Sequence, residues 1–175
     1  MIDQGLLMSH EGIFLGAIRE GDIQVVEKML KTKINPIILR YALSLAAEKG
    51  TEEIVKLLIE ARVGYHEEAM SKAAYTGQMH IVKLFLGLGC KNCDPSLRVS
   101  SLADHLDILN LMIENGATDF EGAMNAAAQG NHLHIVQLLI DKGANDFDSV
   151  LTSKCVLTPD MISFLEICKQ GKVKL

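Results

Sequence analysis

Pairs of branched aliphatic residues recur along the chain at a nearly constant interval. The pair Ile135-Val136 has counterparts 27, 54 and 81 residues earlier, and the first pair precedes this series by 29 residues. In chain order the earlier pairs are Val25-Val26, Ile54-Val55, Ile81-Val82 and Ile108-Leu109. A fixed interval of this length is typical of a chain that is built from repeated supersecondary units.

Each pair lies in a segment whose polar residues form one narrow stripe. Around Ile135-Val136 the stripe is His134, Gln137 and Asp141, at i, i+3, i+7 spacing, which predicts a helix with most of its circumference buried. The equivalent stripes are Gln24, Glu27 and Lys31; Glu53, Lys56 and Glu60; His80 and Lys83, where Gly87 breaks the pattern; and Asp107, Asn110 and Glu114. Such a helix needs neighbours on both flanks, so we expect stacked repeats.

The first half of each unit carries small residues where a second helix has to pack closely. These pairs are Ala17-Ile18, Ala46-Ala47, Ala73-Ala74, Ser100-Ser101 and Ala127-Ala128. Between the two halves stand residues that enter the left-handed region with least strain, namely Gly21, Gly50, Gly77, Asp104 and Asn131. We therefore expect one tight helix-to-helix turn, repeated in every unit.

This pattern resembles that of the ankyrin repeat family. The last unit matches the family's consensus at Met124, Ala127-Ala128, Asn131-His132-Leu133, Ile135-Val136, Leu138-Leu139 and Gly143-Ala144. Two departures accompany the match: the interval is shorter than the family's ~33 residues, and no unit has the Thr-Pro-Leu-His opening. The positions aligned with that His hold Leu15, Ser44, Ser71, Arg98 and Asn125. The resemblance implies an all-α solenoid of helix-turn-helix repeats whose β-hairpin fingers are short or absent.

Three regions are expected along the chain. Residues 1–12 form an N-terminal cap segment in which Leu6, Leu7 and Met8 lie across the first unit, residues 13–145 form five repeats, and residues 146–175 form a degenerate capping repeat and a tail. We expect linkers at Lys31 to Pro36 and Lys91 to Pro95. The capping repeat is expected to pair Val150 to Cys155 with Thr158 to Cys168. Expected helix N-caps are Asp22, Thr51 and Thr158.

Composition and charge narrow the classes of function. The chain has 175 residues, of which 49% are hydrophobic and 5% aromatic, so an aliphatic core is expected. A net charge of −5 argues against nucleic-acid or acidic-membrane partners. The N-terminus has no basic leader, and no apolar run approaches the ~20 residues that span a bilayer. We expect a cytoplasmic monomer with reduced cysteines. Because compact arrays of this kind resemble those of large DNA viruses, a host-cell cytosol is the alternative location.

Candidate chemistry is sparse. Cys90 and Cys93 form a C-x-x-C pair, which is half of a zinc site, but further ligands do not follow nearby in sequence. His105 and His132 share one repeat position, and His80 and His134 share another. The family itself favours His at the first of these positions. No nucleophile, base and orienting group converge, so we expect no enzyme activity, no metal and no cofactor.

The resemblance implies that a protein partner binds the concave face of the array. Carried over by position, the contact residues are Arg19, Glu20, Glu48, Lys49, Tyr65, Tyr75, Thr76, Leu102, Phe120 and Gln129. Tyr75 is the expected anchor because aromatic residues dominate interface hot spots. The expected function is a non-catalytic scaffold or adaptor. The alternatives are a thiol- or zinc-dependent regulator that uses Cys90 and Cys93, and a structural oligomer.

Overall fold

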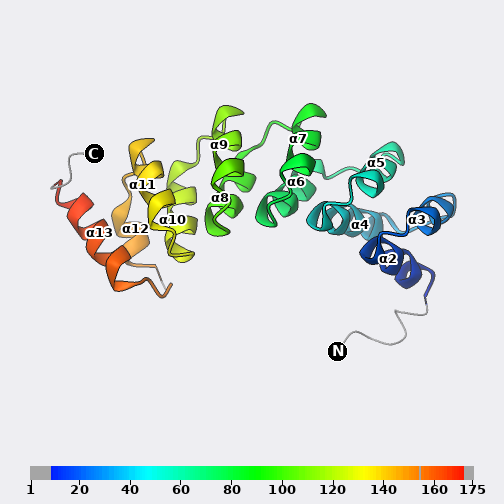
Figure 1. Ribbon diagram of the computed structural model, residues 1–175, viewed down its shortest axis with the longest axis horizontal. Helices are drawn as coiled ribbons and strands as arrows, with labels where there is room; N and C mark the ends of the chain where they lie inside the picture. Colours follow the sequence, from blue (N-terminus) through cyan, green and yellow to red (C-terminus); the bar gives the residue numbers. More distant parts are fainter. Residues whose placement is uncertain (1–8, 154, 172–175) are drawn as a thin grey trace. The chain divides into compact units, whose positions relative to one another are not determined.

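The computed structural model describes residues 9–153 and 155–171, which form stacked antiparallel helix pairs (Figure 1). The chain divides into two compact units, residues 1–90 and 91–175. The first unit holds the pairs α2 (His10–Glu20) and α3 (Ile23–Leu30), α4 (Pro36–Lys49) and α5 (Glu52–Glu60), and α6 (His66–Tyr75) and α7 (Met79–Gly87). The second holds α8 (Asp94–Leu102) and α9 (Leu106–Glu114), α10 (Phe120–Gln129) and α11 (Leu133–Asp141), and α12 (Phe147–Leu151) and α13 (Pro159–Lys169).

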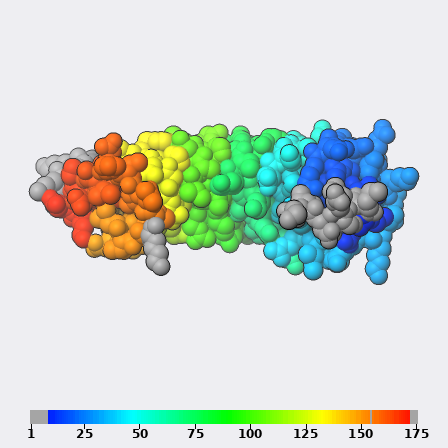
Figure 2. All heavy atoms as spheres, turned by 90° about the horizontal axis from the view of Figure 1, so that it is seen from below, coloured from blue at the N-terminus to red at the C-terminus, as the bar shows by residue number. Residues whose placement is uncertain are grey.

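The fold class is the all-α ankyrin-like solenoid that the sequence predicts. Within each unit the first, inner helix of a pair packs on the inner helix of the next, as α2 does on α4, α4 on α6 and α8 on α10. Side chains fill the spaces between neighbouring ribbons of each unit (Figure 2). None of the described residues lies in a β-strand, and linkers of a few residues replace the family's fingers.

The turn between the two helices of a pair is the same in the five repeats. The φ angles at Gly21, Gly50, Gly77, Asp104 and Asn131 are 76°, 74°, 76°, 65° and 57°. Glycine enters this left-handed region freely, and Asp and Asn enter it with less strain than other residues. The predicted turn is therefore confirmed at all five positions.

The core follows the aliphatic pairs and the small residues. In the outer helices Ile54, Val55, Ile81 and Val82 are fully buried, as are the corresponding residues of α9 and α11. Met70, Met112 and Met124 are also fully buried and fill the core between the helices. The polar stripes face solvent, although Gln137 is half-buried. One apolar residue of the α11 pattern, Leu133, is exposed because it occupies the first position of the helix.

All three predicted N-cap residues occupy helix N-caps, and two of them make the capping bond. Asp22 accepts from the Val25 amide at 3.1 Å, and Thr158 accepts from the Met161 amide at 3.3 Å. Thr51 precedes α5 as predicted, but its side chain makes no capping bond. Its hydroxyl instead donates to the Ala46 carbonyl oxygen at 3.3 Å, so it secures the end of the preceding helix.

Three predicted boundaries are corrected. Pro36 starts α4 rather than ending the linker, because Asn35 caps that helix and proline suits a first turn. Likewise α8 begins at Asp94, inside the predicted linker, because Pro95 suits its first turn. The helix predicted at Val150 to Cys155 is α12, which begins at Phe147 because Asp146 caps it through the Ser149 amide at 3.0 Å. The predicted placement of Leu6, Leu7 and Met8 and of the C-terminal tail lies outside the described residues.

Candidate functional site

The exposed side of α4 and α6 gathers large side chains that the core does not use. Ile37 of α4 is 74% exposed, and Tyr41 of α4 and Tyr75 of α6 are each 49% exposed. Ile37 and Tyr41 are four residues apart, so they lie on one face of α4. The chain has three tyrosines, and all three are exposed in the first unit. Tyr75 was predicted to be here, whereas Ile37 and Tyr41 were not singled out from the sequence.

Thr76 fixes the end of α6 against α4. Its hydroxyl lies 3.0 Å from the Glu48 carbonyl oxygen and 3.1 Å from the Lys72 carbonyl oxygen. This contact brings the end of α6, where Tyr75 lies, against Glu48 at the end of α4. Lys49 and Glu48 are exposed there, as are Arg19 and Glu20 at the end of α2. Thr76 is therefore half-buried and structural, while its neighbours face solvent.

Tyr65 stands before α6 in a left-handed conformation, with φ 68° and 60% of its surface exposed. The Arg40 guanidinium of α4 lies 4.6 Å from the centre of its ring, a cation–π distance. Arg40 also donates through Nε to Glu68 Oε2 at 2.7 Å, and this bond, with the Glu68 charge, raises the pKa of Arg40. Arg40 thus connects α4 to both the linker and α6.

The predicted residues of the second unit are more engaged in the fold. Leu102 is half-buried, and its carbonyl oxygen accepts from His132 Nε2 at 3.0 Å. Phe120 is the half-buried first residue of α10. Gln129 is exposed and donates to the Asn125 side chain at 2.9 Å. In this unit the predicted contact residues therefore present less apolar surface to solvent than the tyrosines of the first unit.

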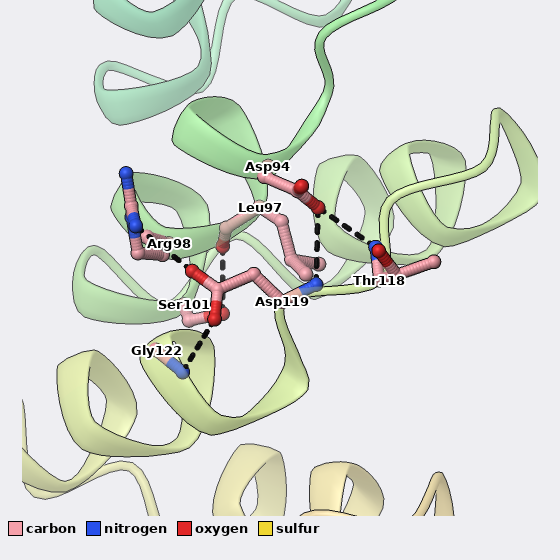
Figure 3. A network of polar contacts seen from close by, with 7 residues as sticks. All are labelled: Asp94, Leu97, Arg98, Ser101, Thr118, Asp119 and Gly122. Atoms are coloured by element: carbon pink, nitrogen blue, oxygen red, sulfur yellow. Dashed lines mark hydrogen bonds and ion pairs between the residues drawn. The ribbon is translucent and has the colours of Figure 1, made fainter.

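A polar network joins two repeats of the second unit (Figure 3). Asp94 Oδ1, in the first turn of α8, accepts from the Thr118 amide at 2.7 Å and the Asp119 amide at 3.0 Å. Asp119 in turn accepts from Arg98 Nη1 at 2.8 Å and caps α10 through the Gly122 amide at 3.0 Å. The linker before α10 is thereby held by α8.

The same connection recurs one repeat later. Glu121, 27 residues after Asp94, accepts from the Asn145 amide at 2.8 Å and the Asp146 amide at 3.0 Å. We call this arrangement the acid clamp: a carboxylate in the first turn of an inner helix that binds two consecutive amides of the next linker. It supplies inter-repeat hydrogen bonds in a chain that lacks the family's Thr-Pro-Leu-His opening. The sequence shows an acid at this repeat position in both repeats, Asp94 and Glu121, although the sequence pattern alone does not identify its amide partners.

Histidines join the turns of adjacent repeats. In the first unit His80 Nε2 lies 3.0 Å from the Gly50 carbonyl oxygen. In the second unit Asp104 Oδ1 lies 2.9 Å from His134 Nε2 and 3.7 Å from His132 Nδ1. Each histidine therefore contacts the turn of the preceding repeat, which is a structural role.

The cysteine pair is enclosed rather than exposed. Both Cys90 and Cys93 are buried. Burial, and to a lesser degree the Asp94 carboxylate, raises the pKa of Cys93, which disfavours the thiolate that metal binding and redox chemistry need. Within residues 9–153 and 155–171, no group of three or more His, Cys, Asp or Glu side chains is arranged to hold a metal ion.

No helix in the described part of the chain has the length and apolar character needed to cross a membrane.

Comparison with protein families agrees with this architecture. A model of ankyrin repeats in three copies matches residues 14–99, and a single ankyrin repeat model matches residues 123–149. No significant match was found among curated proteins. Members of the family generally serve as protein interaction modules and are typically not catalysts. Since the two matches together cover more than half of the sequence, the chain belongs to the ankyrin repeat family.

Proposed function

We propose that this chain is a non-catalytic adaptor that binds a protein partner through the exposed side of α4 and α6. Tyr75 and Tyr41 are the anchors, Ile37 adds apolar area, and Tyr65 contributes at the linker. The observation that carries the proposal is the exposure of all three tyrosines of the chain on one unit. Tyrosine is enriched in protein interfaces and their hot spots.

The helices that carry these tyrosines are held rigidly by the core, which favours a binding role for the exposed side chains. Tyr41 and Tyr75 stand on helices whose other faces are buried, because Leu43 and Ala46 of α4 and Ala73 and Ala74 of α6 are fully buried. Such side chains are held in fixed relative positions before a partner arrives, so association does not have to order a flexible surface. Glu48 and Lys49 at the end of α4, and Arg19 and Glu20 at the end of α2, carry charges of both signs, as a polar rim would.

Affinity capture with matched variants tests the proposal. Tyr41→Ala and Tyr75→Ala alter the exposed side of α4 and α6, while Lys83→Ala alters the polar stripe of α7. We expect each tyrosine variant to weaken capture of the same partner by about tenfold or more, in line with a hot-spot loss above ~1.4 kcal/mol. Lys83→Ala should retain it. Capture that survives both tyrosine substitutions, or that Lys83→Ala weakens equally, refutes the proposed surface.

Light scattering separates this function from that of a structural oligomer. We expect the purified chain to be a monomer whose mass rises only when the partner is added. A stable homo-oligomer that blocks capture would contradict the adaptor role.

A further inference from the structure

The first repeat has an open groove where the later repeats of the first unit are closed. A cavity of about 270 Å³ is lined by Gly12, Ile13, Gly16, Ala17 and Glu20 of α2, with Asp22 and Val25 completing the wall. Ile13 is the largest apolar residue of α2 in this lining, and it is 52% exposed. Glycines at positions 12 and 16 leave a smooth strip along α2, and nothing lies within 4 Å of a Cβ placed on Gly16.

The repeat register shows what kind of surface this groove is. The residues equivalent to Ile13 are Ala42 and Ala69, and those equivalent to Val25 are Ile54 and Ile81; all four are fully buried. Their repeats pack against a preceding inner helix, α2 for α4 and α4 for α6. The groove is therefore the stacking face of the first repeat, meaning the face that a later repeat packs against the repeat before it. No helix pair among the described residues covers this face.

We propose that this groove is the docking site of the chain's own N-terminal segment, residues 1–8, with Leu6, Leu7 and Met8 as the contact residues. The described chain starts beside the groove, because Ser9 caps α2 by accepting from the Gly12 amide at 3.0 Å. Met8 precedes that cap, and Ile13 is the fourth residue of the helix. An apolar residue before the cap commonly packs on the fourth helical residue, an arrangement known as the hydrophobic staple. Ile13 is exposed where such a contact would cover it.

The length of the segment suits the groove. Three extended residues reach about 10 Å, and a helix advances that distance in about seven residues. Leu6 to Met8 can therefore cover α2 from Ser9 to Gly16, and Gly5 permits a change of direction beyond them. The docked segment would act as a cap on the stacking face of the first repeat. The ends of repeat arrays need such a cap because each repeat is stabilised by its neighbours.

A tryptophan reporter tests the docking in the full-length chain. The sequence has no Trp, so Leu7→Trp introduces a single fluorophore, and Val156→Trp provides a control at a residue that is 91% exposed. We expect the Leu7→Trp emission to be shifted to shorter wavelength and to be quenched less by acrylamide than the Val156→Trp emission, at every protein concentration. Adding Ile13→Asp should remove this protection, while Ile23→Asp, at an exposed isoleucine outside the groove lining, should preserve it.

Three results overturn the proposal. The first is equal quenching of the two reporters, which shows that the segment does not dock. The second is protection that appears only as the protein concentration rises, which assigns the groove to a second copy of the chain. The third is protection that Ile13→Asp leaves intact while circular dichroism shows a folded chain, which places the segment elsewhere.

Discussion

Replacing Asp94 by Ala should destabilise the second unit, because the substitution removes the acid clamp at that repeat. Asp94 Oδ1 accepts from two amides, those of Thr118 and Asp119. A hydrogen bond to a charged group contributes about 1.5 to 3 kcal/mol, and an acid in the first turn of a helix adds about 0.3 to 1 kcal/mol. Asp94 is half-buried, so in the variant water can bind the two amides and offset part of the lost hydrogen-bond energy. We expect a decrease of about 2 to 3 kcal/mol in the free energy of unfolding.

Urea unfolding followed by circular dichroism measures this decrease, and amide exchange locates it. The Thr118 and Asp119 amides should exchange faster in the variant, whereas the Asn145 and Asp146 amides, which Glu121 binds, should keep their protection. Asp94→Asn retains an acceptor without the charge, so its effect should be about half as large. Glu114→Ala, at an exposed carboxylate on the polar stripe of α9, is the control and should change stability by less than ~0.5 kcal/mol. If Asp94→Ala has no larger effect than Glu114→Ala, the acid clamp does not stabilise the stack.

Three further predictions concern the core, the turns and the thiols. Leu139→Ala, at a fully buried side chain, should lower the free energy of unfolding in urea by about 2 to 5 kcal/mol. Gln137→Ala, on the adjacent polar stripe, should lower it by less than ~1 kcal/mol. Equal losses would contradict the assigned faces. Gly77→Val should destabilise by about 1 to 3 kcal/mol because φ is 76° there. Gly87→Ala, at the last residue of α7 with open space around it, should stabilise by at most about 0.5 kcal/mol. Because burial raises the pKa of Cys93, its neutral thiol stabilises the fold at lower pH and this contribution is lost as pH rises above the ordinary thiol pKa of 9.0. Mass spectrometry should show iodoacetamide reacting with exposed Cys155 before Cys93, and the reverse order would refute the burial argument.

The turns and the core were predictable because they depend on local chemistry repeated in register. Gly77, Asp104 and Asn131 differ as side chains but share access to positive φ, so one backbone geometry explains all three. Likewise, a narrow polar stripe directly indicates which face of an outer helix is exposed to solvent. These properties can be recognised without knowing how the chain is arranged in space.

Contacts between repeats were less accessible from the sequence. At Asp94 the acid clamp joins residues that are 24 and 25 positions apart in the sequence. Its donors are backbone amides, which the residue types in a sequence do not reveal. Tyr65 and Arg62 both adopt positive φ, which their residue types do not favour. For the binding surface, family positions pointed to Tyr75, but the prominence of Tyr41 depends on which face of α4 remains exposed after α2 and α6 have packed.

The acid clamp also determines where this chain can be recombined. Because the carboxylate and its amide partners belong to successive repeats, a helix pair is not a self-contained cassette. A chimaera that is joined between Asp94 and Thr118 would inherit an acceptor from one parent and donors from the other. Such a crossover is better tolerated when both parents carry the clamp's carboxylate in the first turn of the inner helix. Crossover points should therefore be chosen by the repeat positions of these carboxylates rather than by the ends of the helices.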